Sequence, residues 1–182
     1  MGLDVHVLTM PDTRSEWVAQ RRESIFAAVE QSGYPVVVRE VDGEVGHIGR
    51  GRKRGYALGE LPYVTYVDAD DYLLPGAFAA LRAGLDAGAD AVCPGETVLQ
   101  GGYLLRRPKR HHLIAYRREI ANQFPHADWQ VCGDLALTGL LKAMAGVVDV
   151  SDYSYVHRLY ESPGRLLRRQ HQDELKRAWT HG

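Results

Sequence analysis

The sequence predicts an α/β fold built around a largely parallel sheet. Through the first half of the chain, short β-branched and apolar runs alternate with segments whose apolar residues recur at helical spacing. Polar residues stand at the end of three of these runs: Thr9, Asp42 and Asp68. Because parallel strands bring their carboxyl ends to one edge of a sheet, we expect a ligand site where these three residues converge.

Four apolar runs in the first half are the expected strands. They are rich in valine and aromatic residues, which favour strands, and right-handed crossovers should make them parallel. They span Val5 to Leu8, Val36 to Val41, Tyr63 to Val67 and Ala89 to Cys93.

Helices are expected between these strands. Thr13 and Glu16 have capping-box spacing, which predicts a helix that ends at Gly33. A short helix is expected around Lys53 to Leu58, and Pro75 suits the first turn of another. The buried stripe of that last helix should consist of Phe78, Leu81 and Leu85.

The second half of the chain has a mixed pattern. Glu96 to Arg106 reads as a hairpin around Gly101-Gly102, and Val147 to Val150 as a strand. Leu135 to Met144 and the arginine-rich tail from Pro163 read as helices. This half is too small to be a separate domain, so we expect one domain over residues 1–182, with halves 1–95 and 96–182.

Composition excludes several classes of protein. The 22 basic and 23 acidic residues nearly balance, so the whole chain has no strong electrostatic preference. Its two cysteines have no CxxC spacing, which disfavours a disulfide framework or a zinc site. No apolar run reaches the roughly 18 residues of a membrane span. These features predict a cytoplasmic protein.

The strongest chemical signal is the segment Asp68-Ala69-Asp70-Asp71 after an apolar strand. Three carboxylates this close repel one another unless a cation offsets them. Mg²⁺ and Mn²⁺ prefer carboxylate oxygens and also bind phosphates, so they suit this segment. The alternative is a solvated turn and helix cap, because aspartate favours both positions.

The surrounding residues resemble family 2 glycosyltransferases of the GT-A fold. In Tyr63 to Gly76 an apolar strand runs into Asp-x-Asp-Asp and then into a Pro-Gly helix start, as in that family. Val5 to Thr9 and Val36 to Gly43 resemble its first two strands, and Arg50 to Gly59 resembles its Ala-Arg-Asn-x-Gly helix start. The resemblance covers residues 3 to 95 well and is patchy afterwards.

The resemblance implies a metal-dependent transferase that moves a sugar from a nucleoside diphosphate sugar to an acceptor hydroxyl, with Mn²⁺ or Mg²⁺ as cofactor. The halves 1–95 and 96–182 would then bind the donor and the acceptor. The implied metal ligands are Asp68, Asp70, Asp71 and His157. The implied contacts to the donor nucleotide or its diphosphate are Thr9, Asp42, Arg50, Arg54, Asp68 and Arg158.

The cationic donor contacts have a structural alternative. Arg50 and Arg54 belong to a basic, glycine-rich stretch that would bring cations to a diphosphate near a helix N-terminus. A solvated helix face explains the same charges. His157 and Arg158 resemble a late family segment with a metal ligand or a diphosphate contact, although a lone histidine is more often structural.

Asp134 is the candidate general base, because Gly133-Asp134 resembles the family's Glu-Asp motif at a helix start. An inverting transferase needs a carboxylate that accepts the proton of the acceptor hydroxyl. The alternative is that Asp134 only caps its helix, and Asp128 is the next candidate base.

Two departures from the family leave the identity of the nucleotide open. Lys53 replaces the asparagine of the Ala-Arg-Asn stretch. Of the family's Asp-x-Ser-x-Asp pattern after the second strand, only Asp42 remains clear.

The basic run Arg106 to His112 bears on the acceptor. Together with Arg165, Arg168 and Arg169 it fits an anionic acceptor: nucleic acid such as hydroxylated DNA of a compact viral genome, a phospholipid carrier, or a phosphorylated glycan. The alternative is a solvated loop, which is the commoner explanation of an isolated charge run.

Two other functions compete with sugar transfer. A nucleotidyltransferase is expected to carry a Gly-rich loop after its first strand, where this chain has Thr9-Met10-Pro11. An inactive sugar-nucleotide-binding module is disfavoured by the three intact aspartates.

Overall fold

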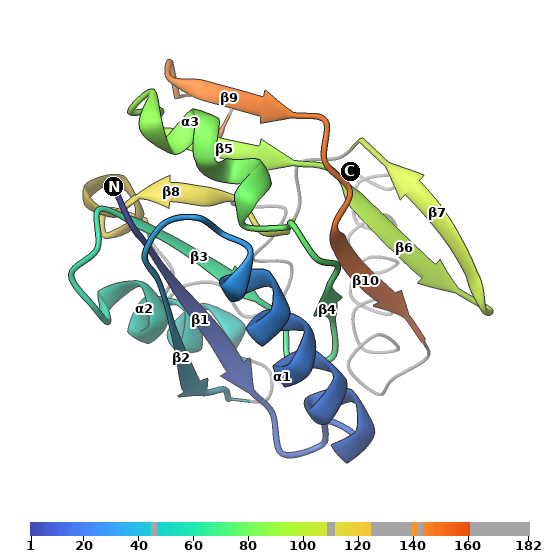
Figure 1. Cartoon of the computed structure of the whole chain (residues 1–182). Helices are drawn as coiled ribbons and strands as arrows, with labels where there is room; N and C mark the ends of the chain where they lie inside the picture. The colour runs from blue at the N-terminus through green and yellow to red at the C-terminus, as the bar shows by residue number, and fades with distance from the viewer. Residues whose placement is uncertain (45–46, 109–111, 125–139, 142–143, 161–182) are drawn as a thin grey trace, which may run out of the picture.

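The computed structural model describes residues 1–44, 47–108, 112–124, 140–141 and 144–160 (Figure 1). Two sheets form the framework of these residues. The six strands of the main sheet are β1 (Leu3–Thr9), β2 (Val36–Asp42), β3 (Tyr63–Val67), β5 (Ala91–Pro94), β8 (Ala115–Arg117) and β9 (Val147–Val150). The four strands of the second sheet are β4 (Tyr72–Leu73), β6 (Glu96–Gln100), β7 (Tyr103–Arg107) and β10 (Tyr155–Leu159).

The main sheet has the strand order β2-β1-β3-β8-β5-β9. Pairing is parallel between β1 and β2, β1 and β3, and β5 and β9, whereas β8 lies antiparallel to β3 and β5. The four predicted strands therefore share one largely parallel sheet, as expected. The antiparallel strand β8 was not predicted, because its three residues are too few for a periodic pattern.

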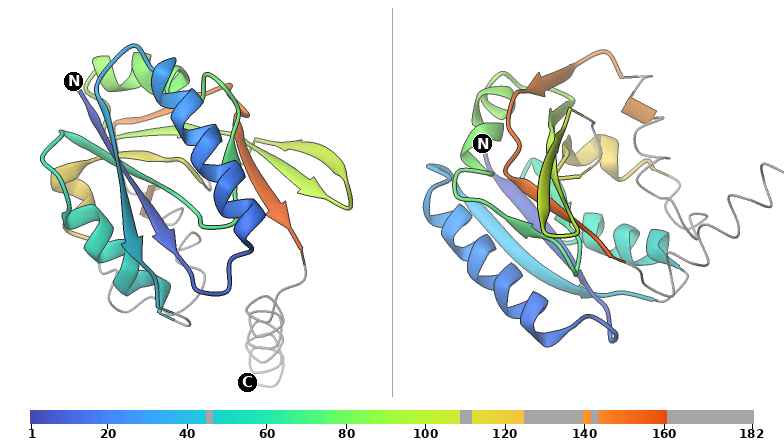
Figure 2. Two further views of the ribbon diagram at one scale, coloured as in Figure 1. Left: turned by 60° about the horizontal axis from the view of Figure 1, so that its bottom comes forward. Right: turned by 90° about the vertical axis from the view of Figure 1, so that its right-hand side faces the viewer.

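Helices cover both faces of the main sheet in a three-layer arrangement (Figures 1 and 2). On one face, the helix α1 (Ser15–Glu30), the 3₁₀ turn η1 (Ala79–Leu81) and α3 (Arg82–Asp86) pack against alternate residues of the strands. On the other face lie α2 (Ile48–Ala57) and α4 (Arg118–Ala121). Both faces of the central strand β3 are consequently buried.

Two predicted helix boundaries were wrong. The capping box does not form: Arg14 is the N-cap of α1 and makes no side-chain capping bond, and the helix ends at Glu30, before Gly33. Helix α2 begins at Ile48 rather than near Lys53. Its glycines lower helix propensity, but a Cβ on Gly55 would lie 2.3 Å from the ring of His6. Close packing on β1 thus outweighs propensity.

The helix predicted after Pro75 is shorter than expected. Gly76 has φ +88°, a conformation that an α-helix does not contain, and regular structure begins only at Ala79. The predicted buried stripe is nevertheless confirmed, since Phe78, Leu81 and Leu85 are all at most 3% exposed.

The predicted hairpin is confirmed as β6 and β7. Gly101 and Gly102 have φ values of +57° and +82°, which two central residues of a type I′ turn require. In the main sheet, β5 and β9 are parallel neighbours. Along the chain, β6 follows β5 and β10 follows β9, and these two strands are parallel neighbours in the second sheet. The second sheet therefore extends from the carboxyl ends of β5 and β9 (Figure 1).

The strand predicted at Val147 to Val150 is confirmed as β9. Most of the helix predicted for Leu135 to Met144, and all of the one from Pro163, lie outside the described residues. Among the helices that the structure describes, none has the length and apolarity needed to cross a membrane.

Candidate functional site

The expected convergence of polar residues is present at the carboxyl edge of the three neighbouring strands β2, β1 and β3. Thr9 and Asp42 are register partners, and the Thr9 hydroxyl donates to Asp42 Oδ1 at 3.1 Å. Val67, the last residue of β3, pairs with Val7 of β1, so Asp68 follows at the same edge. The topology thus brings the predicted nucleotide contacts and the Asp68–Asp71 loop to one side of the sheet.

Asp71 is the most buried carboxylate of that loop, at 1% exposed. The Tyr155 hydroxyl donates to its Oδ2 at 2.7 Å, and the backbone N–H of Arg158 donates to its Oδ1 at 2.8 Å. Burial, followed by the neighbouring Asp70 and Asp68 carboxylates, raises the pKa of Asp71 well above its ordinary value. Burial and the neighbouring carboxylates thus favour the neutral form of Asp71, whereas a cation bound beside it would favour the ionised form.

Two histidines stand beside Asp71. The His112 ring stacks on Tyr155 at 4.8 Å between centroids and meets the His157 ring edge-on at 4.5 Å. His112 Nδ1 lies 2.6 Å from Glu96 Oε2, and its Nε2 lies 3.4 Å from Asp68 Oδ2. One ligand atom from each of Asp71, His112 and His157 falls within 4.8 Å of the others. We call these three residues the carboxylate–histidine cluster.

The cluster fits a divalent transition metal. A carboxylate oxygen and two imidazole nitrogens form a mixed donor set, which Mn²⁺ and softer ions accept more readily than Mg²⁺. The Glu96 carboxylate would fix the His112 tautomer so that Nε2 faces the metal. The chemistry of the residues present is therefore compatible with a metal ion.

The cluster overlaps only partly with the predicted metal ligands. Asp71 and His157 are in it, and Asp68 touches it through His112. Asp70 contributes its backbone carbonyl to Arg158, and its carboxylate is not among the three grouped ligands. His112 was missed, because it lies 41 residues after Asp71 inside a basic run, where the sequence gives no ligand spacing.

The basic stretch after β2 divides into two sets in the structure. Arg52 points inward: its guanidinium bonds to Asp68 and its Cζ lies 3.3 Å from the centroid of the Tyr66 ring. Arg50 and Arg54 pair with Glu44, at 3.3 and 2.6 Å, on the exposed side. Arg52 therefore neutralises part of the negative charge of the Asp68–Asp71 loop, the charge from which a cation was predicted. The predicted contacts of Arg50 and Arg54 with the donor stay predictions.

Two further arginines hold the aspartate loop against α1. Arg21, 1% exposed, donates to the Ala69 carbonyl at 2.9 Å and to Glu40 at 3.1 Å. Arg158 bonds to the Asp70 carbonyl and to Gln20, and its guanidinium lies 4.6 Å from the Tyr72 ring. In this arrangement Arg158 positions the loop, whereas its predicted phosphate contact stays a prediction. The candidate bases Asp134 and Asp128 lie outside the described residues.

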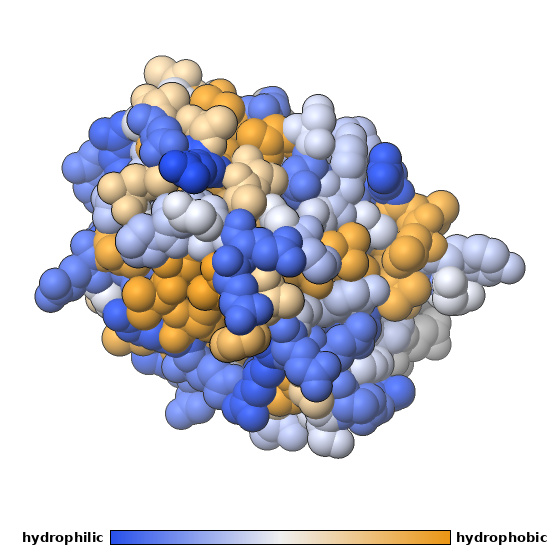
Figure 3. Space-filling model, in the orientation of Figure 1, coloured by the Kyte–Doolittle hydropathy of each residue, from blue (hydrophilic) through white to orange (hydrophobic). Residues whose placement is uncertain are grey.

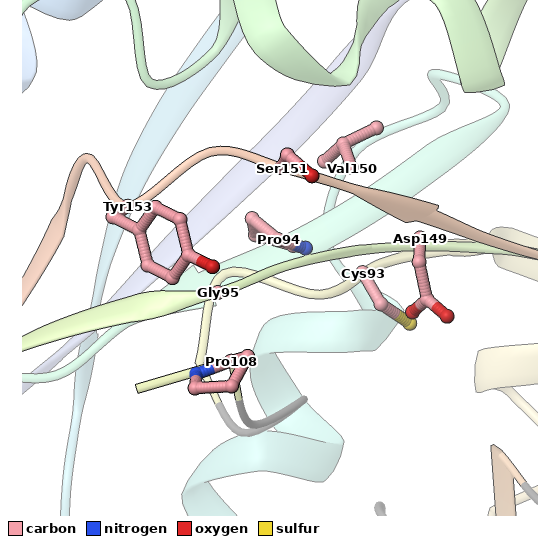
Figure 4. A pocket seen from close by; sticks show the side chains of 8 residues that line it. All are labelled: Cys93, Pro94, Gly95, Pro108, Asp149, Val150, Ser151 and Tyr153. Carbon is pink, nitrogen blue, oxygen red and sulfur yellow. The ribbon is translucent and has the colours of Figure 1, made fainter. Parts of the chain in front are cut away.

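A cavity of about 290 Å³ opens at the carboxyl ends of β5 and β9 (Figure 4). Its lining is Cys93, Pro94, Gly95, Pro108, Asp149, Val150, Ser151 and Tyr153. A Cβ on Gly95 would lie 2.6 Å from the Tyr153 ring, so glycine is needed at this junction. Of the four strands predicted in the first half of the chain, only the fourth contributes to this cavity, together with β9. The lining includes no residue of β1, β2 or β3.

No protein-family model and no curated protein sequence matches the chain. Solved structures do. The structure of S. aureus TarS 1-349 in complex with UDP-GlcNAc superposes with a TM-score of 0.68 and 16% identity, over 90% of this chain and 60% of that one. The UDP complex of the same protein gives a TM-score of 0.65 and 16% identity, over 87% and 61% of the two chains.

A galactosyltransferase has the same architecture. A Drosophila β1,4-galactosyltransferase 7 mutant in complex with manganese, UDP-Gal and xylobiose gives a TM-score of 0.56 and 13% identity, over 88% of this chain and 72% of that one. The fold is thus that of GT-A glycosyltransferases, as the resemblance to family 2 implied. The present chain spans about 60% of the length of the TarS structures that it matches.

Proposed function

We propose that this protein is a metal-dependent glycosyltransferase that transfers a sugar from a nucleoside diphosphate sugar to an acceptor hydroxyl. The observation that carries the proposal is the carboxylate–histidine cluster beside Asp68, at the carboxyl edge of a GT-A sheet. A cytoplasmic enzyme of family 2 remains the expectation from the sequence.

The donor in this proposal is a uridine diphosphate sugar. The structural neighbours are complexes with UDP, UDP-GlcNAc and UDP-Gal, in two proteins that share the fold of this chain. In the proposed complex, Thr9 and Asp42 contact the nucleoside from the ends of β1 and β2, and Arg50 and Arg54 release Glu44 to bind the diphosphate.

Mn²⁺ is the proposed cofactor, held by the cluster with Asp68 and Asp70 at hand. When bound, it would neutralise the leaving diphosphate, which is the chemistry that a divalent cation supplies in such transfers. The Drosophila neighbour is a manganese complex, and two histidine ligands favour Mn²⁺ over Mg²⁺.

Side chains of the protein would position the aspartate loop and accept the proton of the acceptor. Tyr155, Arg21 and Arg158 hold the aspartate loop in place through its carboxylate and carbonyl groups. Asp134 is the proposed base that accepts the proton of the acceptor hydroxyl. The acceptor oxygen then bonds to the anomeric carbon from the face opposite the nucleoside diphosphate, whose bond to that carbon breaks, so the centre is inverted. The acceptor in this proposal carries negative charge, because the chain has the basic run Arg106 to His112.

The decisive experiment incubates the full chain with a panel of nucleotide sugars, with Mn²⁺, with Mg²⁺ or with EDTA, and measures the released nucleoside diphosphate. A transferase slowly hydrolyses one donor without an acceptor, and only with metal. Calorimetry of UDP binding supplies a second readout, since the diphosphate should complete the metal shell and bind more tightly with Mn²⁺. Equal UDP affinity with Mn²⁺ and with EDTA would contradict the metal assignment. In a parallel incubation with a nucleoside triphosphate and a sugar 1-phosphate, release of pyrophosphate would indicate a nucleotidyltransferase.

A further inference from the structure

Among the residues that the structure describes, the most exposed group of neighbouring apolar side chains outside the site lies on one strand of the hairpin. On β7, Tyr103 is 75% exposed, Leu104 59% and Leu105 49%. Successive strand residues point to opposite faces, so these side chains leave both faces of the hairpin apolar. Figure 3 shows hydrophobic surface at the right of the molecule, where Figure 1 places β7. An apolar surface on both sides of one projecting strand is unusual for a part of a protein that only meets water.

The charge of the same strand is entirely positive. Arg106 and Arg107 follow Leu105 directly, and the remaining exposed residues of the hairpin, Gln100, Gly101 and Gly102, are uncharged. The Arg106 guanidinium lies 5.3 Å from the Tyr153 ring, which holds it near the base of the hairpin. Lys109 and Arg110 continue the positive run in the sequence, although their placement lies outside the described residues. The hairpin thus has an apolar, aromatic tip and a cationic base.

The hairpin is also directly connected to the candidate site. Strand β6 carries Glu96, the partner of His112, and β10 pairs with β6 so that His157 stands opposite Val98. Strand β6 ends at Gln100, four residues after Glu96, which corresponds to about 13 Å of extended strand. A molecule bound at the tip would therefore lie about 13 Å along the strand from the carboxylate that contacts His112.

We propose that the β6–β7 hairpin docks this protein onto an anionic phospholipid surface. Tyr103, Leu104 and Leu105 would enter the boundary between headgroups and acyl chains, while Arg106 and Arg107 stay at the level of the lipid phosphates. Apolar insertion combined with electrostatic attraction is how peripheral proteins bind such surfaces. In a step that rests on the proposed function, the acceptor hydroxyl is then presented by a lipid-linked molecule in the same surface.

Charge complementarity selects this partner over a second copy of the chain. A β7–β7 pairing would bury the edge strand but would bring four arginines into one small interface without a described acidic partner. A bilayer with anionic headgroups supplies the missing negative charge at the depth where the arginines lie. Concentration-dependent dimerisation through β7 is accordingly an outcome that the test must detect.

The test is co-sedimentation of the full chain with vesicles, without donor or metal. Vesicles of phosphatidylcholine alone are compared with vesicles in which phosphatidylserine makes up about a third of the lipid. Two variants address the two halves of the proposal: Leu104→Gln/Leu105→Gln and Arg106→Gln/Arg107→Gln. Phe26→Gln and Arg82→Gln are the matched controls, because Phe26 is 66% exposed and the Arg82 side chain 54% exposed elsewhere on the protein.

We expect binding to vesicles to require both the apolar side chains and the arginines of β7. The wild type should prefer the anionic vesicles, and salt should weaken it. The arginine variant should lose roughly fivefold in affinity per charge, hence roughly 25-fold for the pair. The leucine variant should lose about tenfold or more, and both controls should bind like the wild type.

Four results would overturn the proposal. Equal binding to both kinds of vesicle, or no binding by the wild type, excludes an anionic surface as partner. Loss in the arginine variant alone, with equally tight binding to single-stranded DNA, indicates a nucleic-acid site. A wild-type dimer in sedimentation equilibrium that the leucine variant abolishes indicates self-association. Because none of these measurements uses the donor, failure here leaves the UDP-binding test of the transferase untouched.

Discussion

His112 Nδ1 lies 2.6 Å from Glu96 Oε2, and both side chains are buried. This contact turns the other imidazole nitrogen of His112 toward Asp68 and places the ring between Tyr155 and His157. A histidine held in this way by a carboxylate is the arrangement that tunes metal ligands in proteins. Glu96 is therefore a positioning residue of the proposed site, and it links the second sheet to the cluster.

Glu96→Gln should lower the affinity for Mn²⁺ by about 10–100-fold, because glutamine cannot fix the tautomer of His112 as a carboxylate does. Titration of Mn²⁺ followed by electron paramagnetic resonance measures the free ion directly. Glu119→Gln is the control, since the Glu119 side chain is 70% exposed and lies outside the cluster. Unchanged Mn²⁺ affinity in the Glu96 variant would contradict the positioning role of Glu96.

Asp70→Asn and Asp134→Asn should separate donor binding from chemistry. A general base acts on the acceptor proton, so Asp134→Asn should keep UDP affinity while transfer falls by about 10²–10⁴-fold. Asp70→Asn should weaken both, because it removes a carboxylate beside the diphosphate and its metal. Asparagine caps helices nearly as well as aspartate, so a capping role of Asp134 should survive the change. If Asp134→Asn keeps most of the transferase activity, the base lies elsewhere and Asp128 is tested next.

Tyr155→Phe should destabilise the fold and loosen the aspartate loop. The Tyr155 hydroxyl donates to Asp71 Oδ2 at 2.7 Å and accepts from the Asp68 backbone N–H at 3.2 Å. Removing it leaves buried polar groups without these partners, at a cost of about 1–3 kcal/mol. Urea unfolding of the metal-free protein gives the change in free energy. Tyr103→Phe, at an exposed position of β7, should change stability by less than about 0.5 kcal/mol.

Glu40→Gln should reduce stability at neutral pH but not in acid. Arg22, through a side-chain hydrogen bond, and then the charges of Arg22 and Arg21, lower the pKa of Glu40. A carboxylate with a lowered pKa stabilises the fold above its unfolded pKa of about 4.3, and this contribution is lost as the pH falls through the lower folded value. Because the Glu40 side chain is 40% exposed, solvent screening limits the difference at pH 7 to about 0.5–1 kcal/mol.

That difference is measured by urea unfolding of the wild type and the variant at pH 7 and near pH 3. It should shrink at the lower pH, and it should also shrink in concentrated salt, where exposed charges are screened. A difference that is the same at both pH values would mean that packing around Arg21, rather than the charge of Glu40, is responsible.

The fold could be predicted because its signals are local. Tyr63 to Val67 is an unbroken apolar run with aspartates directly after it, and each of these features is readable within a dozen residues. The Gly101-Gly102 turn fixes its hairpin by the same kind of local rule, since only glycine tolerates both positive φ values easily. Helix ends were predicted less well, because packing on β1, as at Gly55, outweighs the intrinsic preferences of the residues.

The sequence by itself determined four strands of the main sheet, their parallel direction and the edge at which Thr9, Asp42 and Asp68 gather. Only the tertiary structure decided which side chains complete the site. His112 reaches Asp68 because the short antiparallel strand β8 begins just after it, and His157 reaches Asp71 because β10 pairs with β4 and β6. These contacts join residues about 40 to 90 positions apart, for which no local periodicity exists. Long-range strand pairing brings such residues together, so their role becomes visible only when the chain is folded.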